Sequence, residues 1–243
     1  MSTNAIQSSH IYSTYFAPRG RSRIYTLGMQ IAQLYLSPFD QIIGFIGEAG
    51  SGKSVLNKTF MGLLDKNGYI DSGSILFEGQ DLTKLKTEKE WERIRGGRIA
   101  MVMQDPMTCL NPLKTIGWQI AESIRYHQGL KGPEAKAKAI QMLRDVGITD
   151  PERRYRQYPH EFSGGMRQRV AIAIAVACNP KILICDEPTT ALDVTIQAQI
   201  IRLISDMQKK YNLTVIYITH DLGVVAKVAD RVAVMYAGDI VEI

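Results

Sequence analysis

The sequence contains only three cysteines, Cys109, Cys178 and Cys185, among its 243 residues. Their small number and wide spacing exclude a disulfide framework and a cysteine-based zinc site. Cys178 and Cys185 stand in apolar surroundings, where a reduced cysteine behaves as a small hydrophobic residue. We therefore expect the chain to work in a reducing compartment such as the cytosol.

Long hydrophobic runs are also missing. The densest apolar stretch, Val170–Cys178, is about half of the roughly 18–20 residues that cross a bilayer. Residues 1–20 have no apolar core behind a basic start, so they do not resemble a secretory signal. Hydrophobic residues make up 45% and charged residues 22%, which excludes collagen-like and disordered chains. The sequence thus predicts a globular protein that neither spans a membrane nor is secreted.

The chain carries a formal net charge of +5, but its lysines and arginines are dispersed. The one tight basic cluster is Arg153, Arg154 and Arg156, with Tyr155 and Tyr158 among them. We interpret this cluster as a solvated loop rather than a nucleic-acid platform. No nucleic-acid partner is expected.

Short, nearly continuous apolar segments rich in β-branched residues are present along the chain. Continuous rather than alternating hydrophobicity is typical of strands buried on both faces of a parallel sheet. The five predicted strands are Ile42–Ile46, Ile99–Met103, Ile182–Cys185, Thr214–Ile218 and Val232–Tyr236.

Segments with helical periodicity separate these strands, and the alternation predicts an α/β fold with a mostly parallel sheet. Ser72–Leu82 alternates and contains glycines, which predicts an antiparallel β-hairpin. Between Thr115 and Cys178 helical periodicity replaces the strand pattern, which predicts an inserted helical block. The predicted helices are Ser54–Leu64, Ile116–Tyr126, Pro133–Val146, Gly164–Cys178, Val194–Tyr211 and Leu222–Ala229.

The strongest single motif follows the first predicted strand and satisfies G-x-x-x-x-G-K-[ST] in the strand–loop–helix context that a phosphate-binding loop requires. Its glycines allow backbone N–H groups to converge on an anion, and the following helix adds the positive end of its dipole. Lys53 would contact the β- and γ-phosphates, and the Ser54 hydroxyl would bind Mg²⁺. Residues expected at ATP are Gly47, Glu48, Ala49, Gly50, Ser51, Gly52, Lys53, Ser54 and Val55.

Two carboxylates, Asp186 and Glu187, end the apolar strand segment Lys181–Glu187. Ligands of doubly wound sheets bind at the carboxyl ends of the strands. Because adjacent strand residues point to opposite faces, we assign the two carboxylates different roles. Asp186 would hold Mg²⁺, and Glu187 would orient or deprotonate a water molecule, which predicts a Mg-ATP hydrolase.

A second predicted anion site lies at the start of the helix that begins near Ser163. Ser163 is a natural N-cap, and Gly164 and Gly165 expose the first amides of the helix. Because the phosphate loop of the same chain already has its own anion, a second copy of the protein would supply the anion here.

These residues resemble the signature motif of ATP-binding cassette (ABC) ATPases, and the resemblance covers nearly the whole chain. Gln104 matches the Q-loop glutamine, residues 191–193 match the D-loop and His220 matches the switch histidine. The resemblance implies one ABC ATPase domain over residues 1–243, with a RecA-like core at about 1–112 and 180–243, an antiparallel β subdomain, and a helical subdomain at about 113–179.

The resemblance further implies a head-to-tail dimer in which each ATP is bound by the Walker A phosphate loop of one subunit and the signature of the other. Gln104, with Ser54 and Asp186, would hold Mg²⁺, and His220 would stabilise charge at the γ-phosphate beside Glu187. The partner-facing residues would be Ser163, Gly164, Gly165, Met166 and Asp193. Adenine would stack on Phe16 or Tyr15.

Long matches around residues 103–112, Met166 and residues 186–199 are similar to the ATPase subunits of oligopeptide, dipeptide and nickel importers. The partners implied are a second ATPase subunit, transmembrane permeases that dock near Gln104–Pro112 at the cytoplasmic face of the membrane, and indirectly an extracytoplasmic solute-binding protein. The cysteine cluster that binds iron–sulfur in many such importers has no counterpart here, so we expect no such centre. The alternatives are an importer ATPase for nickel or another small solute, and a soluble cassette ATPase acting on nucleic acid.

Overall fold

The computed structural model describes residues 6–15, 34–35, 42–66, 68–190 and 192–243. The chain divides into two compact units, of which the first comprises Met1–Trp91 and Tyr217–Ile243 and the second comprises Glu92–Ile216. Both units combine strands with helices, which confirms the α/β class. The boundaries of the core and of the helical subdomain given above stay a prediction.

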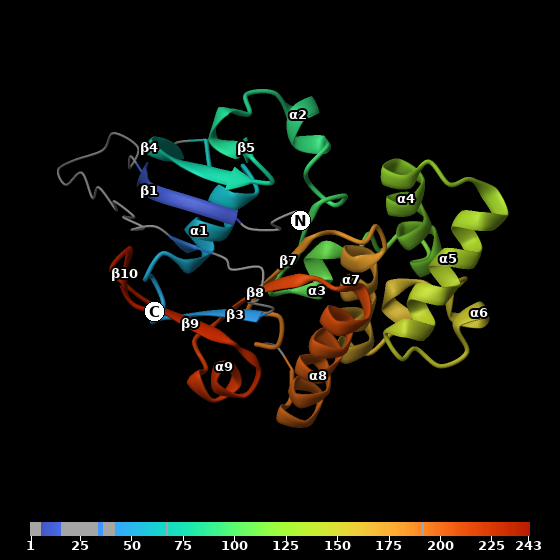
Figure 1. Ribbon diagram of the computed structural model, residues 1–243. Coiled ribbons are helices and arrows are strands. Elements are labelled where there is room, and N and C mark those ends of the chain that lie inside the picture. Colours follow the sequence, from blue (N-terminus) through green and yellow to red (C-terminus); the bar gives the residue numbers. More distant parts are fainter. Residues whose placement is uncertain (1–5, 16–33, 36–41, 67, 191) are drawn as a thin grey trace, which may run out of the picture. The chain divides into compact units, whose positions relative to one another are not determined.

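The parallel part of the first unit is built on β3 (Ile42–Ile46), in which every residue is buried, as its continuous apolar sequence predicts. β9 (Arg231–Tyr236) runs parallel to β3, and β10 (Asp239–Glu242) pairs antiparallel with β9. Two helices, α1 (Lys53–Phe60) and α9 (Leu222–Val228), belong to the same unit (Figure 1).

The packing of α9 on β3 depends on Gly44. A Cβ atom at Gly44 would lie 2.4 Å from Cγ1 of Val225, so only a glycine allows the helix to approach the strand this closely. Val225 is itself fully buried. The strand that leads into the phosphate loop is therefore held from one face by α9.

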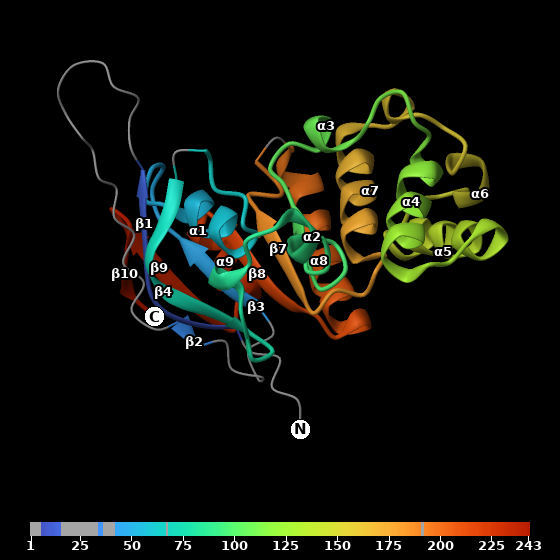
Figure 2. The same cartoon turned by 90° about the horizontal axis from the view of Figure 1, so that it is seen from above.

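The antiparallel part of the first unit has the strand order β2-β1-β4-β5, of which Figure 2 labels β2, β1 and β4. Its strands are β1 (Ile6–Tyr15), β2 (Leu34–Tyr35), β4 (Gly68–Phe77) and β5 (Gln80–Asp81). A tight turn with positive φ at Glu78 and Gly79 joins β4 to β5, which confirms the predicted hairpin. The short helices η1 (Leu82–Lys84) and α2 (Glu88–Glu92) follow.

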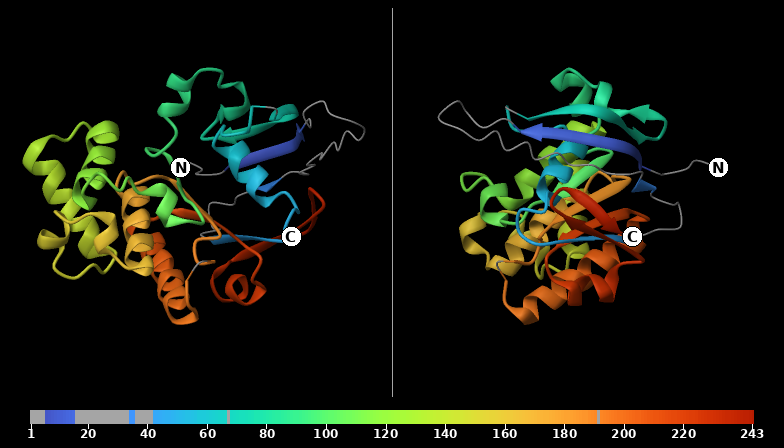
Figure 3. Two further views of the ribbon diagram at one scale, coloured as in Figure 1. Left: turned by 180° about the vertical axis from the view of Figure 1, so that it is seen from behind. Right: turned by 90° about the vertical axis from the view of Figure 1, so that its left-hand side faces the viewer.

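The second unit pairs β6 (Ile99–Val102) and β7 (Ile182–Asp186) in parallel and carries most of the helices (Figure 3). The predicted helical block between Thr115 and Cys178 is confirmed. Its helices, with those flanking it, are α3 (Pro106–Cys109), α4 (Ile116–Gln128), α5 (Gly132–Asp145), α6 (Pro151–Arg154), η2 (Pro159–Glu161), α7 (Gly164–Val176) and α8 (Val194–Tyr211). The chain then enters β8 (Thr214–Thr219), which begins in the second unit and ends in the first.

The carboxylate of Asp145 links α5 to the last turn of α8. It accepts hydrogen bonds from the Tyr211 hydroxyl and from Lys210 Nζ, the latter at 2.6 Å. Burial alone would raise the pKa of Asp145, but these hydrogen bonds outweigh burial and lower the pKa below its usual 3.8. We call these three residues the Asp145 clasp.

The arginine-rich loop is only partly the solvated loop that the sequence predicts. Arg153 and Arg156 are exposed, as expected. Tyr155, however, packs on α4 so closely that a Cβ atom at Gly117 would lie 2.1 Å from its ring. The guanidinium of Arg154 lies 5.5 Å from the ring centre of Phe162.

Cys178 and Cys185 are buried, and burial raises the pKa of both thiols, in agreement with their interpretation as small hydrophobic residues. Cys109 is exposed. Across the described part of the chain, the helices are too short or too polar to span a membrane.

Candidate functional site

The predicted phosphate loop of the first unit connects β3 to α1. Gly50 and Gly52 have φ values of 84° and 100°, a left-handed backbone that glycine adopts without strain. A Cβ atom at Gly50 would meet no other atom within 4 Å, so this turn of the loop is open. Gly52 is the N-cap of α1 and no side chain caps the helix there, so its first amides remain available to an anion.

Lys53 places a cation inside this loop. The residue is only 6% exposed, and its Nζ donates to the carbonyl oxygens of Gly47 and Glu48 at 2.6 and 2.8 Å and to Ser51 Oγ at 3.2 Å. Ser54, on the first turn of α1, is exposed, and Val55 is half-buried. A buried ammonium, uncapped amides and an accessible hydroxyl are the donor set that a Mg²⁺-bound triphosphate requires, so these residues fit that ligand.

Two contacts within the first unit fix the loop in place. A Cβ atom at Gly47 would lie 2.3 Å from the carbonyl oxygen of Met235, so the loop leaves β3 directly against β9. The amide of Gly238, in the turn between β9 and β10, donates to the Ser51 carbonyl oxygen at 3.0 Å. The C-terminal hairpin therefore supports the phosphate loop, a role that no motif in the sequence indicates.

His220 also belongs to the first unit and lies between β8 and α9. Its neighbour Asp221 caps α9 by accepting hydrogen bonds from the amides of Gly223 and Val224 at 2.8 and 3.3 Å. The Asp221 amide in turn donates to Thr219 Oγ1 at 3.0 Å. His220 is exposed, on a short connection that is fixed at both ends.

In the second unit, the register of β6 and β7 brings two predicted residues together. Val102 pairs with Cys185, and Gln104 and Glu187 each follow two residues later. Gln104 Nε2 donates to Glu187 Oε2 at 3.3 Å. The predicted magnesium ligand Asp186 is half-buried at the end of β7.

The backbone at Glu187 differs from our expectation. The prediction placed both residues in the strand, where alternation would send them to opposite faces. β7 ends at Asp186, and Glu187 has a left-handed backbone with φ 45°. Left-handed geometry is uncommon for a residue with a Cβ atom and persists only where other contacts hold it.

The predicted signature lies at the start of α7. Ser163 caps the helix by accepting a hydrogen bond from the Met166 amide at 3.4 Å. Ser163 and Gly164 are exposed, whereas Gly165 and Met166 are half-buried. A Cβ atom at Gly165 would lie 2.7 Å from Ile196 Cγ2, so this glycine also allows α7 to approach α8.

Asp193 caps α8 by accepting a hydrogen bond from the Ile196 amide at 2.9 Å and is exposed. The starts of α7 and α8, which carry the predicted signature and D-loop, thus lie next to each other in the second unit. Ala191 of the predicted D-loop lies outside the described residues. So does Phe16, and of Tyr15 only the backbone is described, which pairs with Gly68.

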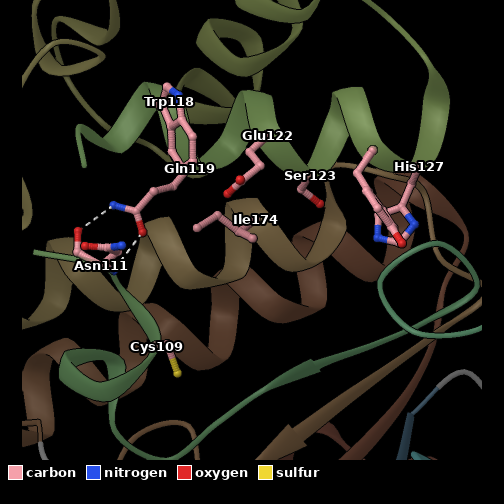
Figure 4. Close-up of a pocket in the computed structure, with 9 residues that line it drawn as sticks. Cys109, Asn111, Trp118, Gln119, Glu122, Ser123, His127 and Ile174 are labelled. Atoms are coloured by element: carbon pink, nitrogen blue, oxygen red, sulfur yellow. Dashed lines mark hydrogen bonds between the residues drawn. The ribbon is translucent and has the colours of Figure 1, made fainter. Parts of the chain in front are cut away.

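A cavity of about 520 Å³ lies in the second unit between α4 and the segment that follows Gln104 (Figure 4). Gln119 on α4 fixes that segment by accepting from the Asn111 amide at 2.9 Å and donating to the Asn111 carbonyl oxygen at 3.1 Å. Leu113, on the same segment, is 81% exposed. The residues that line the cavity are Cys109, Asn111, Trp118, Gln119, Glu122, Ser123, Tyr126, His127 and Ile174.

Sequence reasoning missed one contact of a predicted catalytic residue. Thr190 Oγ1 donates to Glu187 Oε2 at 3.0 Å, the same oxygen that accepts from Gln104. The residue follows Glu187 by three positions, a spacing at which threonine commonly hydrogen-bonds to a preceding residue. That spacing was the available signal, but it does not indicate a carboxylate as the acceptor.

Solved structures resemble the described fold. A dimeric ATP-binding cassette, MJ0796, in a post-hydrolysis state with bound ADP and Pi, matches with a TM-score of 0.78 and 25% identity over 98% of this chain and 97% of that one. The cbiO1 protein of Clostridium perfringens, part of the ABC transporter complex cbiONQ, matches with a TM-score of 0.78 and 27% identity, over 100% of this chain and 88% of that one. These likenesses confirm the expected ABC ATPase fold.

Curated relatives include the oligopeptide transport ATP-binding proteins AmiE of Streptococcus pneumoniae, 61% identical over 202 residues, and OppD of Bacillus subtilis, 58% identical over 203 residues. The dipeptide transport ATP-binding protein DppD of Escherichia coli is 52% identical over 202 residues. Each match covers 83% of this chain, but it spans 57%, 56% and 62% of the respective relative. The family model described as ABC transporter matches residues 32–190, and the chain therefore belongs to the ABC transporter family.

Proposed function

We propose that this chain is the ATP-hydrolysing subunit that drives a membrane importer of peptides. The observation that carries the proposal is the contact of Gln104 with Glu187 at the ends of β6 and β7. This contact joins a residue of the Q-loop to the expected general base. Family membership and relatives named for oligopeptide and dipeptide transport support the assignment and favour peptides over nickel or nucleic acid.

ATP is bound through its phosphates by the loop of residues 47–55. Lys53 exchanges its backbone carbonyl contacts for the β- and γ-phosphate oxygens, which are stronger partners for an ammonium because they are charged. The uncapped amides at the start of α1 complete the cradle. Mg²⁺, when bound, neutralises phosphate charge, and Ser54, Gln104 and Asp186 are the residues that would hold it.

Glu187 takes a proton from the attacking water, and Gln104 holds its carboxylate through Oε2. His220 donates to the γ-phosphate and stabilises the charge that develops there. A positioned base contributes on the order of 10²–10⁴-fold to the rate. Phe16 or Tyr15 supplies the aromatic surface for adenine.

A second cassette, either a copy of this chain or a related one, completes each site. Ser163, Gly164, Gly165 and Met166 at the start of α7, with Asp193, contact the nucleotide that the second cassette binds. The first amides of α7 lie at a solvent-exposed helix start, where a phosphate group bound by the second cassette can reach them. ATP therefore holds the dimer together, and hydrolysis releases it.

Transmembrane permeases dock at the cytoplasmic face of the membrane through the cavity between α4 and the segment after Gln104. The exposed Leu113 and the half-buried Trp118 give this surface an apolar contact that a helix of the partner can bury. The solute is delivered to the permeases by an extracytoplasmic solute-binding protein.

The proposal is tested by measuring ATP hydrolysis and ATP affinity of the purified chain and of Glu187→Gln. The amide keeps the shape of the carboxylate and loses its basicity, so ATP affinity should stay within about twofold while turnover falls by about 100-fold or more. A variant that hydrolyses ATP at close to the parental rate would show that Glu187 is not the base.

Docking is tested by a pull-down from membranes with the parent chain and with Leu113→Asp. The parent should retain peptide permeases and the second cassette, and Leu113→Asp should lose the permeases while its ATP affinity is unchanged, because a charge cannot be buried in an apolar contact without a partner. Equal recovery of permeases by both proteins would place the docking surface elsewhere.

A further inference from the structure

We propose that Thr190 is a positioning residue that orients the carboxylate of Glu187 for water activation. This inference rests on the proposed ATP hydrolysis and adds to it a residue to which no role has been assigned above. Thr190 follows Glu187 by three positions, in the connection between β7 and α8. The connection is described on both sides of residue 191.

Among the described residues, the hydroxyl of Thr190 has two acceptors within reach, both on Glu187. Its Oγ1 lies 3.0 Å from Glu187 Oε2 and 3.4 Å from the Glu187 carbonyl oxygen. A hydroxyl has a single proton to donate, and a carboxylate is a stronger acceptor than a neutral carbonyl. The shorter distance and the charge both favour the bond to Oε2.

Gln104, which follows the neighbouring strand β6, donates to the same oxygen at 3.3 Å. Two donors on one oxygen, one from each connection, fix the plane of the carboxylate. When that plane is fixed, the direction in which the other oxygen Oε1 presents its lone pairs is fixed as well. A base whose lone pair is held in one direction loses less entropy in reaching the transition state.

The backbone of Glu187 explains why its carboxylate needs a second donor to fix its orientation. With φ 45°, the residue is outside the strand geometry that would otherwise define where its side chain points. The turn after it is held by the bonds from the Thr190 amide to the Glu187 carbonyl oxygen at 3.4 Å and from the Leu192 amide to the Thr189 carbonyl oxygen at 3.1 Å. Thr190 therefore lies in a hydrogen-bonded turn, and its hydroxyl restricts the orientation of the Glu187 carboxylate.

The experiment compares Thr190→Val, Thr190→Ser and the parent chain in ATP hydrolysis. Valine keeps the shape of threonine and removes the donor, so we expect kcat to fall about tenfold with KM for ATP unchanged, because ATP is held by the loop of the first unit. Serine keeps the hydroxyl and should restore at least half of the parental kcat. Thr195→Val makes the same chemical change on the exposed first turn of α8 and should leave kcat unchanged.

A second measurement tests the hydrogen bond without hydrolysis. In a double-mutant cycle of equilibrium unfolding, Thr190→Val should raise the unfolding constant about threefold in the parent chain and leave it unchanged in a chain that also carries Glu187→Ala. An equal change in both backgrounds would show that the hydroxyl serves only the local turn, which overturns the inference.

The two proposals fail separately. If the parent hydrolyses ATP, Glu187→Gln does not, and Thr190→Val matches the parent in kcat, the positioning role is wrong and the proposed function stands. If Thr190→Val and Thr190→Ser lose kcat equally, the threonine acts through its methyl group, and positioning through the hydroxyl is also refuted. If Glu187→Gln retains parental turnover, Glu187 is not the base and the proposed mechanism fails irrespective of Thr190.

Discussion

Two helices of the chain begin at glycine-rich segments, and the sequence predicts an anion site at each. α1 starts from Gly52, where no side chain caps the helix, and the buried ammonium of Lys53 belongs to its first turn. α7 starts from Ser163, whose hydroxyl is already bonded to the Met166 amide. Arg167, on the first turn of α7, donates to the Pro159 carbonyl oxygen at 2.8 Å.

The two helix starts differ in whether they can bind a phosphate group without the help of another loop. A helix dipole alone stabilises an exposed anion by about 0.3–1 kcal/mol, which is too little to bind a nucleotide. The start of α1 adds a desolvated cation to that dipole, whereas the start of α7 is exposed and partly capped. The start of α1 should therefore bind phosphate by itself, and the start of α7 only a phosphate that another loop already holds.

The largest expected effect concerns the cation of the first site. Lys53→Ala should weaken ATP binding about 100-fold, since the charge-assisted bonds to two phosphate groups are lost. Isothermal titration with ATP measures the change. Lys58→Ala is the matched control, because Lys58 lies on the same helix, pairs with Asp65 at its surface and should leave affinity unchanged. Unaltered affinity in Lys53→Ala would remove the contrast between the two helix starts.

The second prediction concerns the packing of α7 on α8. Gly165→Ala places a Cβ atom 2.7 Å from Ile196 Cγ2 and should destabilise folding by about 1–3 kcal/mol. Urea unfolding measures the loss, and adding Ile196→Ala should recover part of it, because the smaller side chain removes the clash. ATP affinity of both variants should equal that of the parent, because the loop of α1 binds alone. If Gly165→Ala is as stable as the parent, the two helices are not packed as described.

The third prediction uses the Asp145 clasp to separate stability from nucleotide binding. Asp145→Asn should lower the free energy of unfolding by about 2 kcal/mol at pH 7, because Lys210 loses its charged partner. The folded pKa of Asp145 lies below the unfolded value, so its ionised form stabilises the protein above about pH 4, and this contribution is lost as the pH falls through the folded pKa.

Unfolding of the parent and of Asp145→Asn between pH 7 and pH 3 measures this dependence. The difference between the two proteins should be constant down to about pH 5 and narrow below about pH 4. Asp71→Asn, at an exposed residue of β4, is the matched control and should leave the stability at pH 7 unchanged. A difference that grows as the pH falls would have the wrong sign for a carboxyl group with a lowered pKa.

The smallest expected effect concerns the cap of α7. Ser163→Ala removes the acceptor for the Met166 amide and should cost about 1 kcal/mol of folding stability, with ATP affinity unchanged. Thermal unfolding provides the measurement, and Ser163→Asn, which retains a capping oxygen, should restore most of the stability. A Ser163→Ala variant that loses ATP affinity as severely as Lys53→Ala would show that the start of α7 binds nucleotide by itself.

The buried strands could be predicted from the sequence because a continuous apolar run has few alternatives to burial. Ile42–Ile46 and Val194–Tyr211 have the predicted boundaries as a strand and a helix. The predicted helix Ser54–Leu64 ends earlier, at Phe60. There Gly62 takes a left-handed backbone, and a Cβ atom on it would lie 2.3 Å from Trp91, a contact that depends on a residue distant in sequence.

The strand Ile6–Tyr15 was not predicted, because its polar sequence has neither a continuous nor an alternating apolar pattern, and its structure depends on pairing with β4. In the candidate site, the motifs indicated which residues matter but not their contacts. The left-handed backbone of Glu187 and its bond from Thr190 depend on how the chain turns after β7, and local propensity does not define that turn.

The central claim is that ATP is hydrolysed only between two cassettes, one supplying the Lys53 loop and the other the start of α7. Light scattering recorded during ATP hydrolysis tests it most directly. If the claim is right, Glu187→Gln has the mass of two chains with ATP and of one chain with ADP. The rate of ATP hydrolysis by the parent chain should rise more than proportionally with protein concentration. A parent chain that hydrolyses ATP at its full rate while its mass stays that of one chain would contradict the account.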